Sequence, residues 1–160
     1  MKKILDAADR RILSELASDG QVGAGELAER LGVTAPTIRT RVRGMISQGL
    51  MRIAGLVDPF AVKGLSAALV GIKLQSQMQL DQKLEEISAL PDVNWAAVVT
   101  GRYDILVELI TSEDISGLYD FLDKTLSSVG GVASSESFVV MKARRKWIPL
   151  PRGARTWFAE

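Results

Sequence analysis

Gly32, Thr34 and Pro36 lie close together between two short segments of helical apolar periodicity, and this spacing constrains the fold more than any other feature. Gly32 can take a positive φ angle and therefore end a helix over roughly residues 25–31. Thr34 offers a hydroxyl N-cap for a second helix from about Ala35, and Pro36 fits its first turn because a missing N–H is harmless there. The spacing predicts a helix-turn-helix.

The second helix is predicted to bury one face. Ile38, Val42 and Met45 recur at i, i+4 and i+7 and form the apolar stripe. In a helix-turn-helix, side chains at the start of this helix reach base edges in the major groove, while others hold phosphates. Arginines on a solvated face also occur in helices that bind nothing, but the turn, the cap and the preceding helix favour DNA binding. The candidates are Pro36 on the free surface, Thr37, Thr40 and Arg41 for base contacts, and Thr34, Arg39, Arg43 and Arg52 for phosphate contacts.

A further helix is predicted before this pair. Residues 6–17 carry an apolar face that includes Ile12, Leu13 and Leu16, and Asp19-Gly20 ends the segment. Residues 51–57, after the recognition helix, are predicted to be extended. Three helices followed by an extended segment indicate a winged helix-turn-helix.

The second half of the chain changes from helical period to alternating strands and helices. Asp58-Pro59 and Gly64 mark a boundary between Val57 and Leu65. Strands are predicted at residues 67–74, 95–99, 103–110 and 137–142, and helices at residues 81–90 and 115–126. This βαββαβ order predicts an α+β ferredoxin-like domain, in which both helices cover one face of an antiparallel sheet. The predicted domains are residues 1–57, a linker at 58–65, the sheet domain at 66–142 and a tail at 143–160.

The predicted strands are apolar on both faces. In a sheet with one solvent-exposed face, apolar and polar residues alternate along each strand. The predicted strands lack this alternation at Val98-Val99, residues 105–107 and residues 138–140, where all residues are apolar. The face without helices therefore needs a cover, and a second copy of the sheet across a twofold axis is the simplest one. A homodimer also suits DNA binding, because paired recognition helices meet half-sites one or more helical turns apart.

Charge is unevenly distributed along the 160 residues, whose formal net charge is +1. Residues 1–64 hold 10 Lys/Arg against 7 Asp/Glu, residues 65–141 hold 4 against 11, and residues 142–160 hold 6 against 1. The basic N-terminal segment suits a polyanion such as double-stranded DNA. The acidic middle suits solvent, a small ligand or another subunit.

The composition disfavours several classes of protein. The chain has no Cys and no His, which removes disulfides, thiolate metal sites, the usual general base and the commonest metal ligand. We therefore expect no enzyme, no metal and no cofactor. No apolar run approaches the roughly 18 residues that span a bilayer, and Met1-Lys2-Lys3 leads into a charged amphipathic helix. We expect a cytoplasmic protein with no membrane partner.

Two groups of residues form signatures in a fixed order. The first comprises Leu5-Asp6, Asp9, Ile12-Leu13, Leu16, Asp19-Gly20, Glu26-Leu27-Ala28, Leu31-Gly32-Val33-Thr34, Arg41-Val42 and Gly49-Leu50-Met51. The second comprises residues 99–106, Gly131-Val132 and residues 138–141. Together they resemble the Lrp/AsnC family, the feast-or-famine transcriptional regulators of bacteria and archaea, over nearly the whole chain up to about Met141. Gly44 and Ser47-Gln48 depart from the family pattern within the recognition helix.

The resemblance implies a winged helix-turn-helix joined to a ligand-sensing ferredoxin-like domain, with dimers that assemble into octamers or related rings. It also implies an amino-acid effector, bound between dimers near residues 101–104. On this loop Gly101 permits close backbone approach, and Asp104 has a carboxylate for the ammonium group of the effector. Arg102 would pair with the carboxylate of the effector, and Tyr103 would shape the wall. An ordinary hairpin turn with a solvated Asp104 is the alternative.

Ser134 and Ser135, which lead into the last strand, are weaker candidates for polar contacts across the dimer interface. The basic tail is either solvated and partly disordered, or it anchors its aromatic residues on a neighbouring subunit. Those aromatic residues are Trp147, Trp157 and Phe158, and the cations that would add to a basic surface are Arg144, Arg145 and Lys146.

The expected function is that of a sequence-specific transcriptional regulator, which binds DNA and responds to a small effector through oligomer rearrangement. Two alternatives stay open. One is an architectural protein that wraps DNA without an effector. The other is a tetrapyrrole-modifying enzyme of the same fold, which the absence of histidine disfavours.

Overall fold

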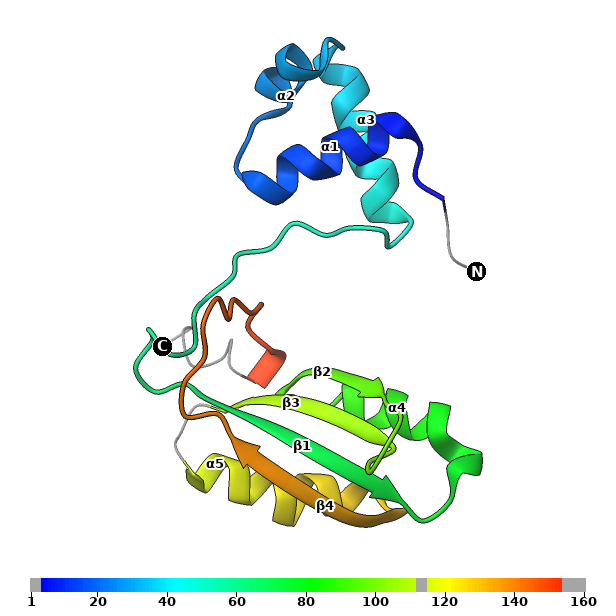
Figure 1. Ribbon diagram of the computed structural model, residues 1–160, viewed down its shortest axis with the longest axis vertical. Coiled ribbons are helices and arrows are strands. Elements are labelled where there is room, and N and C mark those ends of the chain that lie inside the picture. The colour runs from blue at the N-terminus through cyan, green and yellow to red at the C-terminus, as the bar shows by residue number, and fades with distance from the viewer. Residues whose placement is uncertain (1–3, 112–114, 154–160) are drawn as a thin grey trace. The chain divides into compact units, whose positions relative to one another are not determined.

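The structure is a computed structural model that describes residues 4–111 and 115–153 (Figure 1). The chain divides into two compact units, one ending at Ala54 and the other beginning at Gly55. Each unit has its own apolar core.

The first unit contains three helices, α1 (Ala7–Ser18), α2 (Ala24–Leu31) and α3 (Ala35–Ser47). Asp6 caps α1 by accepting the N–H of Asp9 at 2.7 Å. Gly32 ends α2 with φ = 67°, a left-handed conformation that glycine adopts without a Cβ penalty. The predicted turn between α2 and α3 is therefore confirmed. The helices enclose a core that includes Ile12, Leu27, Ile38 and Met45.

The extended segment predicted after α3 forms no strand within the described residues of the first unit. Residues 51–56 follow α3 without regular secondary structure, and residues 52–56 are exposed. A strand needs a partner for its backbone N–H and C=O groups, and within the part of the first unit that the structure describes no second strand is present. The first ladder contact after α3 is a single bridge from Val57 to Ile148, in the second unit.

The second unit contains a four-stranded antiparallel sheet in the order β2-β3-β1-β4. This order confirms the ferredoxin-like prediction. The elements are β1 (Ser66–Leu74), the 3₁₀ turn η1 (Gln77–Gln79), α4 (Leu80–Ser88), β2 (Val93–Val98), β3 (Ile105–Thr111), α5 (Ile115–Asp120), the π-helix η2 (Phe121–Leu126), α6 (Ser127–Val129) and β4 (Val132–Val139).

The largest differences from the predicted boundaries concern the second helix and the last strand of this unit. The helix expected over residues 115–126 widens into a π-helix and runs on to Val129. The last strand begins at Val132, earlier than the predicted residue 137. Gly130 and Gly131 explain the early start, because both take positive φ angles, 67° and 70°, and turn the chain from the helix directly into the strand.

One face of the sheet packs against the helices. The β1–β3 register places Val70 opposite Val107 and Ile72 opposite Ile105, and all four side chains are fully buried. Ile87 of α4 and Phe121 of η2 belong to the same core. The alternate residues of each strand therefore point to the other face.

This second face, which we call the open face, is covered only in part. A row of side chains crosses all four strands at Trp95, Glu108, Leu69 and Phe138, as the paired registers require. Trp95 is 38% exposed and Phe138 is 47% exposed, whereas Glu108 in the same row is only 3% exposed. The low exposure of Glu108 shows that another segment covers the middle of the row.

The cover is the chain that follows β4. Ile148 is buried against Ala67 and Ile110, and it exchanges two backbone hydrogen bonds of 2.9 Å with Val57. Lys146 places its Nζ 2.5 Å from Oε1 of Glu108. Neither expectation for the tail describes Lys146 and Ile148, since they pack on their own sheet, whereas Arg144 and Arg145 are exposed. Trp157 and Phe158 lie outside the described residues.

Candidate nucleic-acid interface and effector loop

The outer face of α3 carries the candidate DNA contacts that are free in the structure. Ile38 and Met45 are buried, and the residues on the opposite side of the helix are exposed. Among the described residues, no ion pair engages Arg39, Arg43 or Arg52, so these guanidinium groups are available to phosphates. Pro36 and Thr40 are also exposed on this face.

Thr34 and Thr37 interact with each other. Thr34 has the extended backbone of an N-cap residue, as predicted, but its hydroxyl makes no hydrogen bond to a backbone N–H of α3. The hydroxyl instead lies 2.9 Å from that of Thr37. Both side chains remain exposed, so the pair presents two hydroxyl groups at the start of the recognition helix.

Arg41 is engaged within the protein. Its Nη1 donates to Oδ2 of Asp6 at 2.7 Å and to Oδ1 of Asp9 at 2.9 Å. The pKa of Asp6 is held below its ordinary value, first by the N–H of Asp9 and then by Arg41. These contacts fasten α3 to the start of α1. A base contact from Arg41 would have to compete with both carboxylates.

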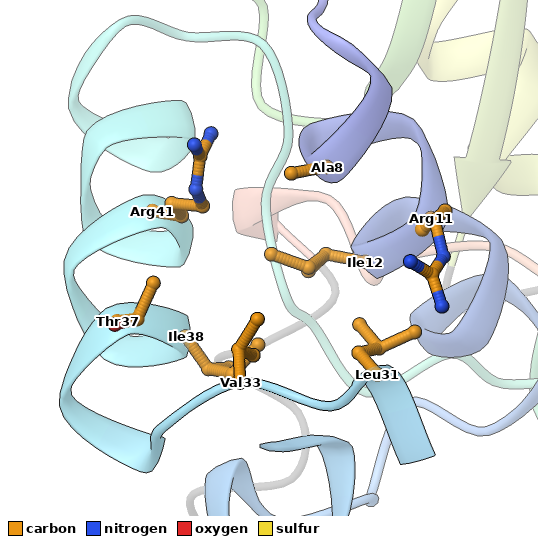
Figure 2. A pocket seen from close by; sticks show the side chains of 8 residues that line it. All are labelled: Ala8, Arg11, Ile12, Leu31, Val33, Thr37, Ile38 and Arg41. Carbon is orange, nitrogen blue, oxygen red and sulfur yellow. The ribbon is translucent and has the colours of Figure 1, made fainter. Parts of the chain in front are cut away.

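A small hollow lies between α1, α3 and the turn. Figure 2 shows Ile12, Leu31 and Val33 turned into it, with Arg11 and Arg41 on either side. Its volume of about 40 Å³ is close to that of one water molecule and far below the roughly 300 Å³ of ordinary ligand pockets. The hollow is therefore a packing gap in the helical unit.

Asp104 holds the loop between β2 and β3 in place. One carboxylate oxygen accepts the backbone N–H of Leu74 at 2.9 Å, and the other accepts Nζ of Lys73 at 3.0 Å and Nε2 of Gln77 at 3.2 Å. These contacts hold the pKa of Asp104 below its ordinary value of 3.8, with the N–H of Leu74 as the largest cause. The side chain is 7% exposed. Asp104 is thus an anchor for the loop, and both of its oxygens already have partners.

Tyr103 lies flat on the open face because Gly71 makes room for it. A Cβ built on Gly71 would come within 2.5 Å of Cδ2 of the Tyr103 ring. The Tyr103 hydroxyl donates to Oε2 of Glu136 on β4, and this contact raises the pKa of Tyr103 above its ordinary value. Arg102 completes the arrangement, with its Nη2 3.2 Å from Glu136 Oε2 and its guanidinium 5.6 Å from the centre of the Tyr103 ring.

A hollow of about 320 Å³ opens beside this cluster. It brings together four of the predicted effector residues with two that the sequence reasoning missed. The side chains that line it are those of Lys73, Arg102, Tyr103, Ser134, Ser135 and Glu136. We call it the effector hollow. Gly101 has φ = 115°, a conformation that favours glycine, but it does not line the hollow, and a Cβ built on it would meet no atom within 4 Å.

Two signals in the sequence point to this cluster, and one of them could have found Glu136. A lone glycine inside a strand often marks the close approach of another group, and Gly71 is such a residue. Glu136 lies two residues beyond Ser134 and therefore on the same face of β4. Lys73 had no comparable signal, because its place opposite Ser134 depends on the β1–β4 register.

A second hollow, of about 400 Å³, adjoins the first through Ser134 and Ser135. Leu122 and Leu126 of η2, together with Gly130 and Gly131, form its other side. The edge strand β4 thus has a hollow on either side of the same two serines.

Comparison with known proteins decides the family. A family model described as the Lrp/AsnC ligand binding domain matches residues 67–147, and a second, the AsnC-type helix-turn-helix domain, matches residues 5–46. The chain belongs to the Lrp/AsnC family of transcriptional regulators. Its helical unit is therefore the helix-turn-helix domain of a DNA-binding regulator, and its sheet unit is the ligand-binding domain.

Individual Lrp/AsnC proteins match over most of their length. An uncharacterised helix-turn-helix type regulator of Pyrococcus abyssi is 31% identical over 144 residues, which cover 89% of this chain and 89% of that protein. The leucine-responsive regulatory protein of Rhizobium meliloti is 30% identical over 141 residues, covering 86% and 90%. The solved structure of E. coli AsnC has a TM-score of 0.72 at 26% identity, and the match covers 90% of this chain and 97% of that one.

The relatives of this Lrp/AsnC chain and its described helices bear on two further expectations. They are named as transcriptional regulators, which agrees with a protein that is not an enzyme. Among the described residues, no helix combines the length and the apolar character needed to cross a membrane.

Proposed function

We propose that this protein is a sequence-specific transcriptional regulator whose effector is an amino acid or a close analogue, bound in the effector hollow. The observation that carries the proposal is the charge arrangement of that hollow. Cations of Lys73 and Arg102 and the carboxylate of Glu136 line the same space of about 320 Å³. An α-amino acid carries one group of each sign, so it can pair with both.

We assign roles to Arg102, Glu136 and Asp104 according to whether each side chain can exchange its present partner for the effector. Arg102 has a 78% exposed side chain, and its contacts with Glu136 and with the Tyr103 ring lie at the surface, so it can turn to an effector carboxylate. Glu136 would then accept the effector ammonium group. We assign Asp104 the supporting role of fixing Lys73 and the loop, in place of direct contact with the effector.

Serines and the Tyr103 ring supply the rest of the proposed site. Ser134 and Ser135 offer hydroxyl groups, and the ring forms an apolar wall. The relative named for its response to leucine supports an amino acid as the class of effector, but it does not identify the effector of this chain.

We propose that the protein binds DNA as a dimer. The exposed Trp95 and Phe138 on the open face favour a twofold dimer, and such dimers would assemble further into an octamer or a related ring. A dimer presents two α3 helices to successive major grooves, with Thr37 and Thr40 toward base edges and Arg39, Arg43 and Arg52 toward phosphates. An effector acts only if it binds one assembly more tightly than another, because equal affinity for both shifts nothing.

The test measures DNA binding and effector binding on the same protein. The purified chain is titrated against the DNA upstream of its own gene and against an unrelated fragment, at a stated salt concentration. The amino acids are then screened by thermal shift, and those that stabilise the protein are added to the DNA titration. Preferential binding that one amino acid alters would support the proposal. Binding without preference and without any amino-acid effect would favour an architectural protein.

A further inference from the structure

The segment that covers the open face is strongly basic. Residues 142–153, which we call the C-terminal strap, contain five Lys/Arg and no Asp/Glu. Residues 65–141 of the same unit contain 4 Lys/Arg and 11 Asp/Glu. The cations of this unit are therefore concentrated on one segment, within a unit that otherwise repels polyanions.

The strap is held firmly against the sheet. Ile148 is 1% exposed, and its N–H and C=O both bond to Val57 at 2.9 Å. Lys146 pairs with Glu108, which also accepts Nδ2 of Asn94 at 2.6 Å. Farther along, Gly153 donates its N–H to the carbonyl of Pro91 at 2.9 Å. Contacts at three points fix the backbone, so the remaining side chains are presented from a defined platform.

The other cations of the strap point to solvent. Lys142, Arg144 and Arg145 are exposed, and in the described ranges none of them has an ion-pair partner. Arg145 has φ = 57°, an uncommon left-handed conformation that turns the strap just before Lys146 reaches the sheet. Trp147, on the other side of Lys146, is 59% exposed. The inward Lys146 thus lies between outward-facing basic and aromatic groups.

We propose that the outward face of the strap is a second DNA-binding surface, which contacts the phosphate backbone. The inference rests on the proposed function, because it requires that the protein bind DNA. Unpaired guanidinium and ammonium groups on a fixed backbone favour phosphate oxygens, and Arg144 and Arg145 place two such cations side by side in the sequence. The strap adds affinity without sequence information.

The first experiment measures the salt dependence of DNA affinity for the full-length protein. Each phosphate contact contributes about 0.9 to the slope of log affinity against log salt concentration. The double variant Arg144→Gln/Arg145→Gln should therefore lower the slope by roughly 1.8 per engaged protomer, equally on specific and unrelated DNA. Arg144→Lys/Arg145→Lys should restore most of it, because lysine also pairs with phosphate.

The matched control removes the same charge elsewhere in the unit. Lys63→Gln/Lys124→Gln eliminates two cations outside the strap and should leave the slope nearly unchanged. If the strap variant keeps the wild-type slope, or if the control loses as much, the inference is wrong. Failure of the wild type to bind any DNA would instead overturn the proposed function itself.

A second experiment detects the contact directly, whatever the variants do to assembly. Because the chain has no cysteine, Arg144→Cys supplies a unique attachment point for a maleimide photocrosslinker. Illumination of the complex should attach DNA to this position, and not to the exposed position Ser128→Cys on α6. Crosslinking from both positions or from neither would contradict a specific strap surface.

Discussion

At the scale of single residues, Asp104 fixes the loop between β2 and β3 to β1. Its carboxylate is buried, accepts the N–H of Leu74 and holds Lys73 beside the effector hollow. The folded state lowers the pKa of Asp104, so its charge stabilises the fold above the ordinary value of 3.8, and this contribution is lost as pH falls through the lowered pKa. Asp104→Asn should therefore lower the melting temperature at neutral pH, and the difference from wild type should shrink in acid. Thermal unfolding between about pH 7 and pH 2 measures this difference; a gap that stays constant with pH would show that the charge is not what matters.

A second residue-scale prediction concerns Gly71. The Cβ of Gly71→Ala would overlap the ring of Tyr103, so the ring must move away from Glu136. Overpacking of this kind costs about 1–3 kcal/mol. We expect lower stability in denaturant and a pKa of Tyr103 that returns toward its ordinary value. Ultraviolet titration, with Tyr103→Phe subtracted to isolate this residue, measures the pKa, and an unchanged value would mean that the ring had not moved.

At the scale of elements, one face of α3 packs in the helical core and the other is the proposed DNA-binding face. Ile38 lies 1% exposed in the helical core, so Ile38→Ala should lower the free energy of unfolding by about 2–5 kcal/mol. Arg39→Ala and Arg43→Ala remove exposed side chains, so they should leave stability unchanged and lower the salt slope of DNA binding by about 1 each. Denaturant unfolding and DNA titrations separate the two effects. Loss of stability in the arginine variants would assign them to packing instead.

Arg41 belongs to the same element but joins it to α1. Because its guanidinium pairs with Asp6 and Asp9, Arg41→Ala should lower the melting temperature of the helical unit. DNA affinity should then fall for all sequences together. Full stability combined with a loss confined to the preferred DNA sequence would instead favour the base contact that the sequence suggested for Arg41.

At the scale of the whole molecule, the open face is the surface on which we propose that two subunits meet. Phe138 is 47% exposed at the edge of the row that crosses the sheet, where a second copy would bury it. Phe138→Glu should place a charge in that interface and convert dimers to monomers in sedimentation measurements, with the helix-turn-helix still folded. Persistence of the dimer would mean that subunits meet elsewhere.

The response to effector is also a property of the whole molecule. Arg102→Ala and Glu136→Gln should abolish the change in DNA affinity that an amino acid causes, while affinity without effector stays within about twofold of wild type. Lys63→Ala, an exposed change outside the hollow, serves as the control. A variant that binds the effector normally but no longer responds would place these residues in the coupling between sites and not in the binding site.

Much of the architecture could be predicted from local patterns in the sequence. Gly32, Thr34 and Pro36 marked the turn, and the stripe through Ile38 and Met45 marked the buried face of α3. The order of strands and helices sufficed for the ferredoxin-like topology, because connection rules leave few arrangements for βαββαβ. Residues 51–56 form no strand in the described part of the first unit, because an extended segment becomes a strand only when a partner is available.

The sequence by itself determined the two domains, their folds and the segments that form the candidate sites, since capping, periodicity and glycine geometry act over a few residues. Only the tertiary structure decided which charged groups remain free. Arg41 meets Asp6 across 35 residues, Asp104 meets Leu74 across 30, and Glu108 meets Lys146 through the fold of the strap. Such pairings depend on packing and strand register, so composition could suggest a charged site but not whether its charges were already neutralised within the protein.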